Sequence, residues 1–119
     1  MKRTLIIGAS SNPQRYAFMA AEKLTAYGHE IELLGLRSDV VAGKTIDTDR
    51  KQYADIDTVT LYVGPQHQES YCDYVIGLKP KRVIFNPGTE NTEFQILLKK
   101  NGIDYEEACT LVMLGTGQY

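Results

Sequence analysis

Short β-branched and aliphatic segments alternate along the chain with segments whose apolar residues recur at helical spacing. The first pattern predicts strands over residues 4–7, 29–34, 58–63, 82–85 and 103–105, with a brief edge strand near 45–46. The second predicts helices over 14–27, 65–77 and 91–101, which end at or next to Gly28, Gly77 and Gly102. Residues 49–54 are expected to form a polar turn or a single helical turn.

This order of elements predicts one domain over residues 1–119 with a Rossmann-like, three-layer α/β/α fold. A crossover helix makes its two flanking strands parallel, so the sheet should be mostly parallel, with five or six strands and helices on both faces. The apolar run at 111–114 should pack on the body, and the glycine-rich end of the chain should fray.

The first predicted strand runs into a turn of small residues before the first helix. These residues are Gly8, Ala9, Ser10, Ser11, Asn12 and Pro13. Gly8 would let a ligand approach the main chain, and the free N–H groups and dipole of a helix start attract an anion. The turn therefore predicts a nucleotide diphosphate site, although it matches neither GxGxxG nor GxxxxGK[ST]. The alternative is a turn whose small residues only keep it tight.

Ligands of such sheets bind outside the carboxyl ends of the strands, where the strand order reverses. If the first strand is central, three loops open at one crevice: residues 8–13, 35–39 and 63–65. The second loop contributes Gly35, Arg37 and Asp39, and the third contributes Val63, Gly64 and Pro65. Arg37 suits the ribose phosphate of NADP or coenzyme A, and Arg15 suits a pyrophosphate, because guanidinium groups match phosphate oxygens. Each arginine on its own also fits a solvated surface position.

Composition and charge restrict the partners. The 119 residues carry a net charge of −2, which argues against nucleic acid and anionic membrane as partners. No apolar run approaches a membrane span and no signal-like segment opens the chain, so the cytoplasm is the expected location. The two cysteines are expected to be reduced. A flat apolar edge or the run at 111–114 would allow a homodimer.

Few residues suggest catalysis. His29 opens a strand away from the predicted crevice and is expected to be structural, whereas His67 follows Pro65 and lies near the site as a phosphate contact, a base or a solvated residue. Neither histidine has cysteine or carboxylate neighbours at metal-ligand spacing, so no metal site is expected. Cys72 falls on a buried helical stripe. Cys109 either packs in the interior or faces the crevice.

The runs GASSNPQRYAFMAAEKLTAYGHEIELLG, AGKTIDT, YADI, VGP, FNPGTEN and EACTLVML together resemble the small stand-alone coenzyme A-binding domain proteins. The fold of that family is similar to the N-terminal domain of the succinyl-CoA synthetase α-subunit. The likeness extends over about residues 4–114. It implies a Rossmann-like fold that binds the ADP portion of coenzyme A.

The resemblance also implies site residues. It places Gly8, Ser10, Asn12, Pro13 and Arg15 on the family's first loop, Pro65 on the loop after the fourth strand, Gly88 and Asn91 on the turn before the penultimate helix, and Cys109 where the family often has a cysteine. Two departures concern Ala17, where relatives often have serine, and residues 35–37, where they often have Asn-Pro. The second departure leaves open how the adenine and the ribose phosphate are recognised.

The residues and the resemblance together predict a protein that binds coenzyme A or an acyl-CoA as a non-catalytic sensor, carrier or accessory subunit. Ligases with such a domain also carry a phosphohistidine segment and a nucleotide-grasp domain, and dehydrogenases add a substrate domain to the Rossmann core. The sequence shows none of these parts, so binding rather than catalysis is expected. The alternatives are a small NADP-dependent oxidoreductase or its remnant, and an interaction scaffold without a ligand.

Overall fold

The most apolar segments of the chain form the centre of one sheet. In the computed structural model, which describes residues 1–119, β1 (Thr4–Ala9) lies between β2 (Ile31–Gly35) and β5 (Thr58–Leu61). The sheet continues through β6 (Arg82–Phe85) and β7 (Asp104–Glu107) on one side, and through β4 (Lys44–Asp47) and β3 (Val40–Val41) on the other. All neighbouring strands are parallel except the β3–β4 pair. The Rossmann-like α/β fold expected from the sequence is confirmed.

The sheet has seven strands, where five or six were expected. The additional strand is β3, which forms an antiparallel hairpin with β4 at the sheet edge. Its turn is Ala42-Gly43, and both residues have positive φ angles, of 52° and 77°. Only two valines mark this strand, so the alternation that identifies longer strands is missing.

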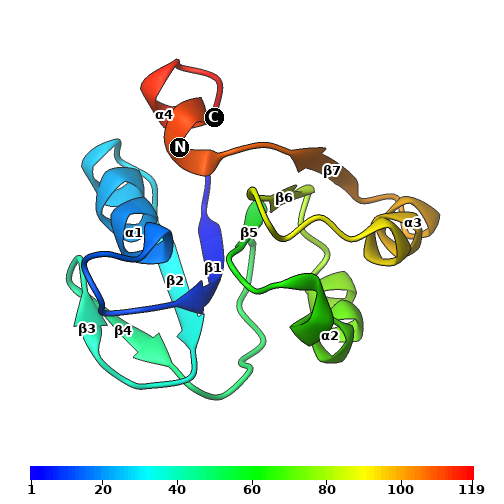
Figure 1. Cartoon of the computed structure of the whole chain (residues 1–119), viewed down its shortest axis with the longest axis horizontal. Helices are drawn as coiled ribbons and strands as arrows, with labels where there is room; N and C mark the ends of the chain where they lie inside the picture. Colours follow the sequence, from blue (N-terminus) through cyan, green and yellow to red (C-terminus); the bar gives the residue numbers. More distant parts are fainter.

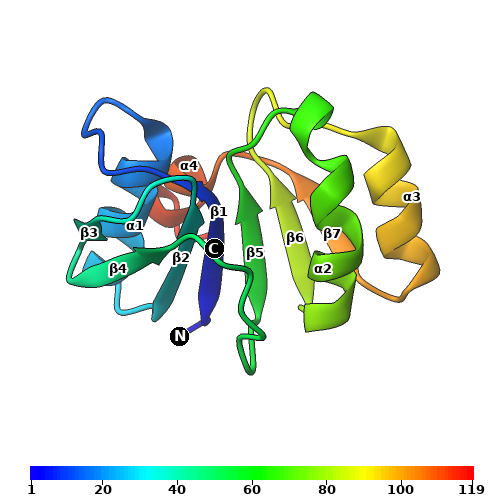
Figure 2. The ribbon, with the colours of Figure 1, turned by 90° about the horizontal axis from the view of Figure 1, so that it is seen from below.

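Two helices cover each face of the sheet (Figure 1 and Figure 2). On one face, α1 (Tyr16–Ala26) and α4 (Thr110–Gly115) pack over β1 and β2. On the other, α2 (Cys72–Leu78) and α3 (Thr92–Lys100) pack over β5 and β6. The buried face of α1 is rich in alanine, which lets its backbone lie close to the sheet.

The chain after β5 does not enter an α-helix directly at Pro65, as the sequence suggested. It forms two short 3₁₀ turns, η1 (Pro65–His67) and η2 (Glu69–Tyr71), and α2 begins only at Cys72. The interruption falls at Gln68, whose fully buried side chain donates to the main-chain oxygens of Val63 and Thr89. A regular helix that began at Pro65 would give Gln68 a different backbone position, from which its side chain would have to reach the same two oxygens.

Residues 48–56, called the strap below, connect β4 to β5 without regular secondary structure. The helical turn that the sequence allowed at 49–54 therefore does not form. No main-chain N–H group of the strap donates a hydrogen bond within the protein. Side chains hold it instead: the Tyr53 hydroxyl donates to Asp47 at 2.5 Å, Arg50 donates to the Ser70 hydroxyl at 3.0 Å, and the Tyr74 hydroxyl donates to a strap carbonyl.

The expectation that the glycine-rich end of the chain frays is wrong. The hydroxyl of Tyr119 lies 2.5 Å from that of Thr4, and the guanidinium of Arg82 lies 4.5 Å from the centre of the Tyr119 ring. Arg82 and Lys2 also donate to the main-chain oxygen of Tyr119, and the His29 ring packs against the tyrosine ring at 4.9 Å. Lys2 and Arg82 both lie within cation–π distance of this ring, and composition alone does not reveal such contacts.

None of the helices combines the length and the apolar character that crossing a membrane requires.

Candidate functional site

All the predicted site residues lie at one edge of the sheet. Because β1, β2, β5, β6 and β7 are parallel, the loops that follow them open on the same side. The strand order reverses between β1 and β5, which are neighbours at the sheet centre (Figure 2). Such a reversal is where ligands bind in open α/β sheets. The residues placed at this carboxyl edge are Gly8, Ala9, Ser10, Ser11, Asn12, Pro13, Arg15, Gly35, Arg37, Val63, Gly64, Pro65, His67, Gly88, Asn91 and Cys109.

The strand ends approach each other closely where two glycines stand. Gly8 has φ +92°, and a Cβ added to it would lie 2.9 Å from the main-chain oxygen of Tyr62. A Cβ on Gly35 would lie 2.5 Å from the main-chain oxygen of Ala9. These glycines therefore allow strand ends to pack against each other. The ligand approach that the sequence suggests for Gly8 stays a prediction.

The first loop uses several of its own N–H groups. The Ser10 hydroxyl accepts from the Asn12 amide at 3.1 Å, and the Asn12 side-chain oxygen accepts from the Gln14 amide at 3.0 Å. The main-chain oxygen of Asn12 accepts from the amide of Arg15 at 3.0 Å. Ser10 and Asn12 thus shape the turn, and these three amides are occupied within the protein.

Four other N–H groups of this region donate no hydrogen bond within the protein. They belong to Ser10 and Ser11 in the loop and to Tyr16 and Ala17 at the start of α1. The N-terminus of α1 has no side-chain cap, and the loop is exposed from Ser11 onward. Unpaired amides together with the positive end of a helix dipole are the elements of an anion site.

The loop after β2 brings charges of both signs to this edge. Arg37 is exposed and forms no hydrogen bond or ion pair within the protein. Hydrogen bonds from the Val40 amide and the Ser11 hydroxyl lower the pKa of Asp39. Asp39 thus brings a carboxylate to the loop after β2, at the same sheet edge as the first loop.

The loop after β5 faces the first loop across the strand reversal. The amides of Val63 and Gly64 donate no hydrogen bond within the protein, and Pro65 and His67 are exposed. An open hollow of about 540 Å³ is lined by Gln66, His67, Glu69 and Ser70. The predicted position of His67 near the site is therefore consistent with the geometry of this edge, while its imidazole has no hydrogen-bonded partner.

The turn after β6 is largely structural. Gly88 has φ +91°, and its amide donates to Glu90 at 2.9 Å. Asn91 caps α3, since its side-chain oxygen accepts from the Phe94 amide at 3.1 Å. The side-chain nitrogen of Asn91 donates to Gln68 at 3.1 Å. Both polar atoms of Asn91 therefore already have partners in the protein.

Cys109 lies directly before α4 and is partly exposed. The next residue, Thr110, donates its amide to the side-chain oxygen of Asn86 at 2.9 Å, which fixes the start of α4 against the end of β6. On the same face of the sheet, burial raises the pKa of the Tyr62 hydroxyl to about 12.

Two side chains at this edge could carry chemistry, His67 and Cys109. Neither forms a side-chain hydrogen bond with another residue. Burial raises the pKa of the Cys72 thiol. No group of three histidine, cysteine or acidic side chains is placed to hold a metal ion.

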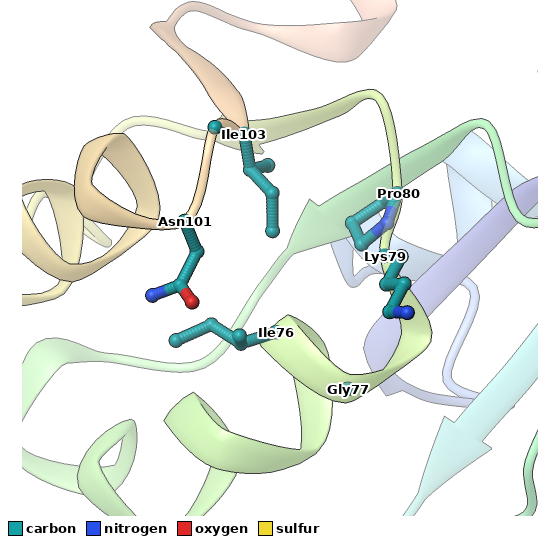
Figure 3. Close-up of a pocket in the computed structure, with 7 residues that line it drawn as sticks. Ile76, Gly77, Lys79, Pro80, Asn101 and Ile103 are labelled. Atoms are coloured by element: carbon teal, nitrogen blue, oxygen red, sulfur yellow. The ribbon is translucent and has the colours of Figure 1, made fainter.

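A separate hollow lies at the opposite edge of the sheet. It measures about 390 Å³ and is lined by Ile76, Gly77, Lys79, Pro80, Asn101, Gly102 and Ile103 (Figure 3). These residues end α2 and α3 and lead into β6 and β7, so they lie at the amino ends of the strands. No predicted site residue contributes to it. The hollow is therefore distinct from the candidate site.

Two residues important to the carboxyl edge were missed from the sequence. Gln68 and Asn86 are almost completely buried, and each forms three side-chain hydrogen bonds. The FNP sequence marks a turn after a strand, and Gln68 sits in a polar stretch, so nothing in either pattern indicates a buried amide.

Comparisons with known proteins agree with this picture. A family model described as a CoA binding domain matches residues 2–115. The crystal structure of an uncharacterized protein is 51% identical with a TM-score of 0.98, covering 100% of this chain and 98% of that one. A protein of Thermus thermophilus is 21% identical with a TM-score of 0.84, covering 99% and 90%. A hypothetical protein of Pyrococcus horikoshii OT3 is 23% identical with a TM-score of 0.87, covering 97% and 82%. The search of curated proteins gives no match.

Proposed function

The chain belongs to the CoA-binding domain family, and from that premise we propose that it binds coenzyme A or an acyl-CoA through the ADP moiety at the carboxyl ends of β1 and β5. The pyrophosphate would be held by unpaired amides of the first loop and of the start of α1, together with Arg15. Arg37 would hold the phosphate on the ribose. Bound coenzyme would supply a thiol or thioester at the end of its pantetheine arm.

One observation carries the proposal. Four N–H groups, of Ser10, Ser11, Tyr16 and Ala17, lie at the strand reversal without an acceptor in the protein. Arg15 precedes α1 and Arg37 follows β2 at the same sheet edge, and both are exposed in a chain with a net charge of −2. In a protein without a general basic surface, this local set of donors suits a ligand with several phosphate oxygens.

The proposed role is non-catalytic: a sensor, a carrier or an accessory subunit. It is supported by the lack of hydrogen bonds that would activate His67 or Cys109. The family membership supports coenzyme binding and does not distinguish among these roles.

Asp39 favours a second candidate, a small nicotinamide-dependent oxidoreductase or its remnant. Its carboxylate follows β2, where an acidic residue holds the ribose hydroxyls of NAD. Arg37, two residues earlier, would instead favour a phosphorylated ribose. A scaffold without a ligand is the third alternative, and it predicts no binding to any nucleotide.

Isothermal titration with coenzyme A, dephospho-coenzyme A, NADP and NAD separates these candidates. Arg37→Ala should weaken coenzyme A by about 1–3 kcal/mol and leave dephospho-coenzyme A unchanged, because only the former carries the ribose phosphate. Arg15→Ala should weaken both by a similar amount. Lys99→Ala, an exposed cation on α3, is the control and should change neither affinity. Binding of NADP alone would favour the oxidoreductase, and silence from all four ligands would refute coenzyme binding.

A further inference from the structure

Two buried amide side chains connect the loops that follow three neighbouring strands. Gln68 is 0% exposed and lies after β5, and Asn86 is 2% exposed and lies directly after β6. Each uses both hydrogens of its NH₂ group and its oxygen in hydrogen bonds. A buried amide with all its partners fixes the groups around it, because breaking one bond would leave a polar atom unsatisfied.

Gln68 joins the loop after β5 to the loop after β6. Its nitrogen donates to the main-chain oxygen of Val63 at 2.8 Å and to that of Thr89 at 2.7 Å. Its oxygen accepts from Asn91, the cap of α3, at 3.1 Å. Because two carbonyl oxygens face the same end of the side chain, that end must be the NH₂ group.

Asn86 joins the loop after β6 to the start of α4, on the other face of the sheet. Its nitrogen donates to the Thr60 hydroxyl at 2.6 Å and to the main-chain oxygen of Leu61 at 2.9 Å. Its oxygen accepts from the amide of Thr110 at 2.9 Å, directly after Cys109. The hydroxyls of Thr60 and Thr110 lie 2.8 Å apart and complete the cluster.

Thr89 links the two amides. Its main-chain oxygen accepts from Gln68, while its amide and its hydroxyl donate to the main-chain oxygen of Asn86 at 2.9 and 2.8 Å. Thr89 is itself 5% exposed. A continuous buried chain of hydrogen bonds, called the amide relay below, therefore runs from Val63 through Gln68, Thr89 and Asn86 to Thr110.

We propose that Gln68 and Asn86 are positioning residues of the candidate site: the amide relay holds the loop after β5 and the Cys109 end of α4 as one rigid rim of that site. This inference rests on the proposed function, because the rim has a purpose only if the site holds a ligand. A preformed rim reduces the ordering cost of binding. Neither amide needs to touch the coenzyme.

The relay predicts that loosening one end disturbs the other. Cys109 reports on the far end, since Gln68 has no contact with it. The parent for all variants is Cys72→Ser, because the Cys72 thiol contacts the main-chain oxygen of Gln68 at 3.5 Å and would itself respond. The rate at which an aromatic disulfide reagent labels Cys109 is measured well below the melting temperature of each variant.

Gln68→Ala and Asn86→Ala should each speed the labelling of Cys109 by at least about fivefold, because local opening exposes the start of α4. The double variant should be no faster than the faster single variant, since both substitutions break the same chain of contacts. Asn101→Ala is the matched control: this exposed amide donates to the Leu97 oxygen at the opposite edge, and its loss should leave labelling unchanged.

Thr89 provides a second pair of variants if an amide variant fails to fold. Thr89→Val removes the hydroxyl that donates to Asn86 and should speed labelling, whereas Thr89→Ser keeps it and should label at the parent rate. The affinity of each variant for coenzyme A is then measured by calorimetry. Variants that label faster should bind the coenzyme at least about tenfold more weakly, as expected when a binding site loses its preformed geometry.

The outcomes separate the relay from the proposed function. Faster labelling together with weaker coenzyme binding supports the relay. Unchanged labelling in Gln68→Ala, or faster labelling with unchanged affinity, overturns the relay while the parent still binds. No binding of coenzyme A by the parent overturns the proposed function and, with it, the role of the rim.

Discussion

Replacing Gly35 with alanine tests the close packing of strand ends on which the candidate site rests. The added Cβ would lie 2.5 Å from the main-chain oxygen of Ala9 and 3.0 Å from a methyl group of Ile46. The oxygen cannot rotate away, because it belongs to the backbone of β1. The ends of β1 and β2 would therefore have to move apart until this contact exceeds 3.0 Å.

Overpacking of this kind costs about 1–3 kcal/mol. For a domain of this length, each kcal/mol corresponds to about 4 °C in melting temperature, so Gly35→Ala should melt about 4–12 °C below the wild type. Gly77→Ala is the matched control, with the same chemical change. Gly77 lies inside α2 with no atom within 4 Å of an added Cβ, so the alanine should stabilise by about 0.5–1 kcal/mol.

Urea unfolding followed by far-ultraviolet circular dichroism measures both effects, since the chain has no tryptophan for fluorescence. The slope with urea should be unchanged and only the midpoint should move. A Gly35→Ala protein within about 0.5 kcal/mol of the wild type would show that the strand ends are not held together as described. Equal destabilisation by both alanines would refute the steric explanation.

Three further predictions concern ionisable side chains. Burial lowers the pKa of His29 below 6.5, so the native state binds a proton less tightly than the unfolded chain. The free energy of unfolding should therefore fall as the pH drops below about 6.5, and it should fall less in His29→Gln. Thermal melts from pH 8 to 5 measure this. The hydrogen bond from Tyr53 lowers the pKa of Asp47, so Tyr53→Phe should reduce the free energy of unfolding by about 1 kcal/mol at neutral pH. The difference from the wild type should vanish as the pH falls through the native pKa of Asp47, below 3.8. Urea titrations at a series of pH values measure it. Tyr119→Ala should cost about 2 kcal/mol and Tyr119→Phe about 1 kcal/mol in the same assay, and equal losses would assign the whole effect to the hydroxyl.

The sequence predicted the parallel sheet because strand and helix patterns alternate along the chain, and a crossover helix makes its two flanking strands parallel. It also predicted that the candidate residues meet at one edge, since that follows from parallel strands alone. The hairpin strand β3 was not predicted because two residues are too few to show an alternating apolar and polar pattern. The end of the chain was expected to fray because its glycine content does not indicate that the Tyr119 ring lies near the cations of Lys2 and Arg82.

The interior of the site was harder to predict than its location. Gln68 and Asn86 are polar residues in loop-like segments, and such residues are usually solvated. Their burial depends on contacts with residues more than twenty positions away, such as Thr89 and Thr110. The close approach of Tyr62 to Gly8 is likewise seen only in the structure, while the ligand contact at Gly8 stays a prediction.

The strap is the segment in which amide hydrogen exchange and proteolysis should be fastest. Nine consecutive amides, from residue 48 to 56, lack protein acceptors, while β1 and β5 are paired with a strand on each side. Deuterium should therefore enter this stretch long before it enters β1 or β5, and a protease should cut here first while the rest of the chain remains native. A cleaved molecule would keep its sheet and its two layers of helices, because the cut would fall between β4 and β5, outside every helix and strand.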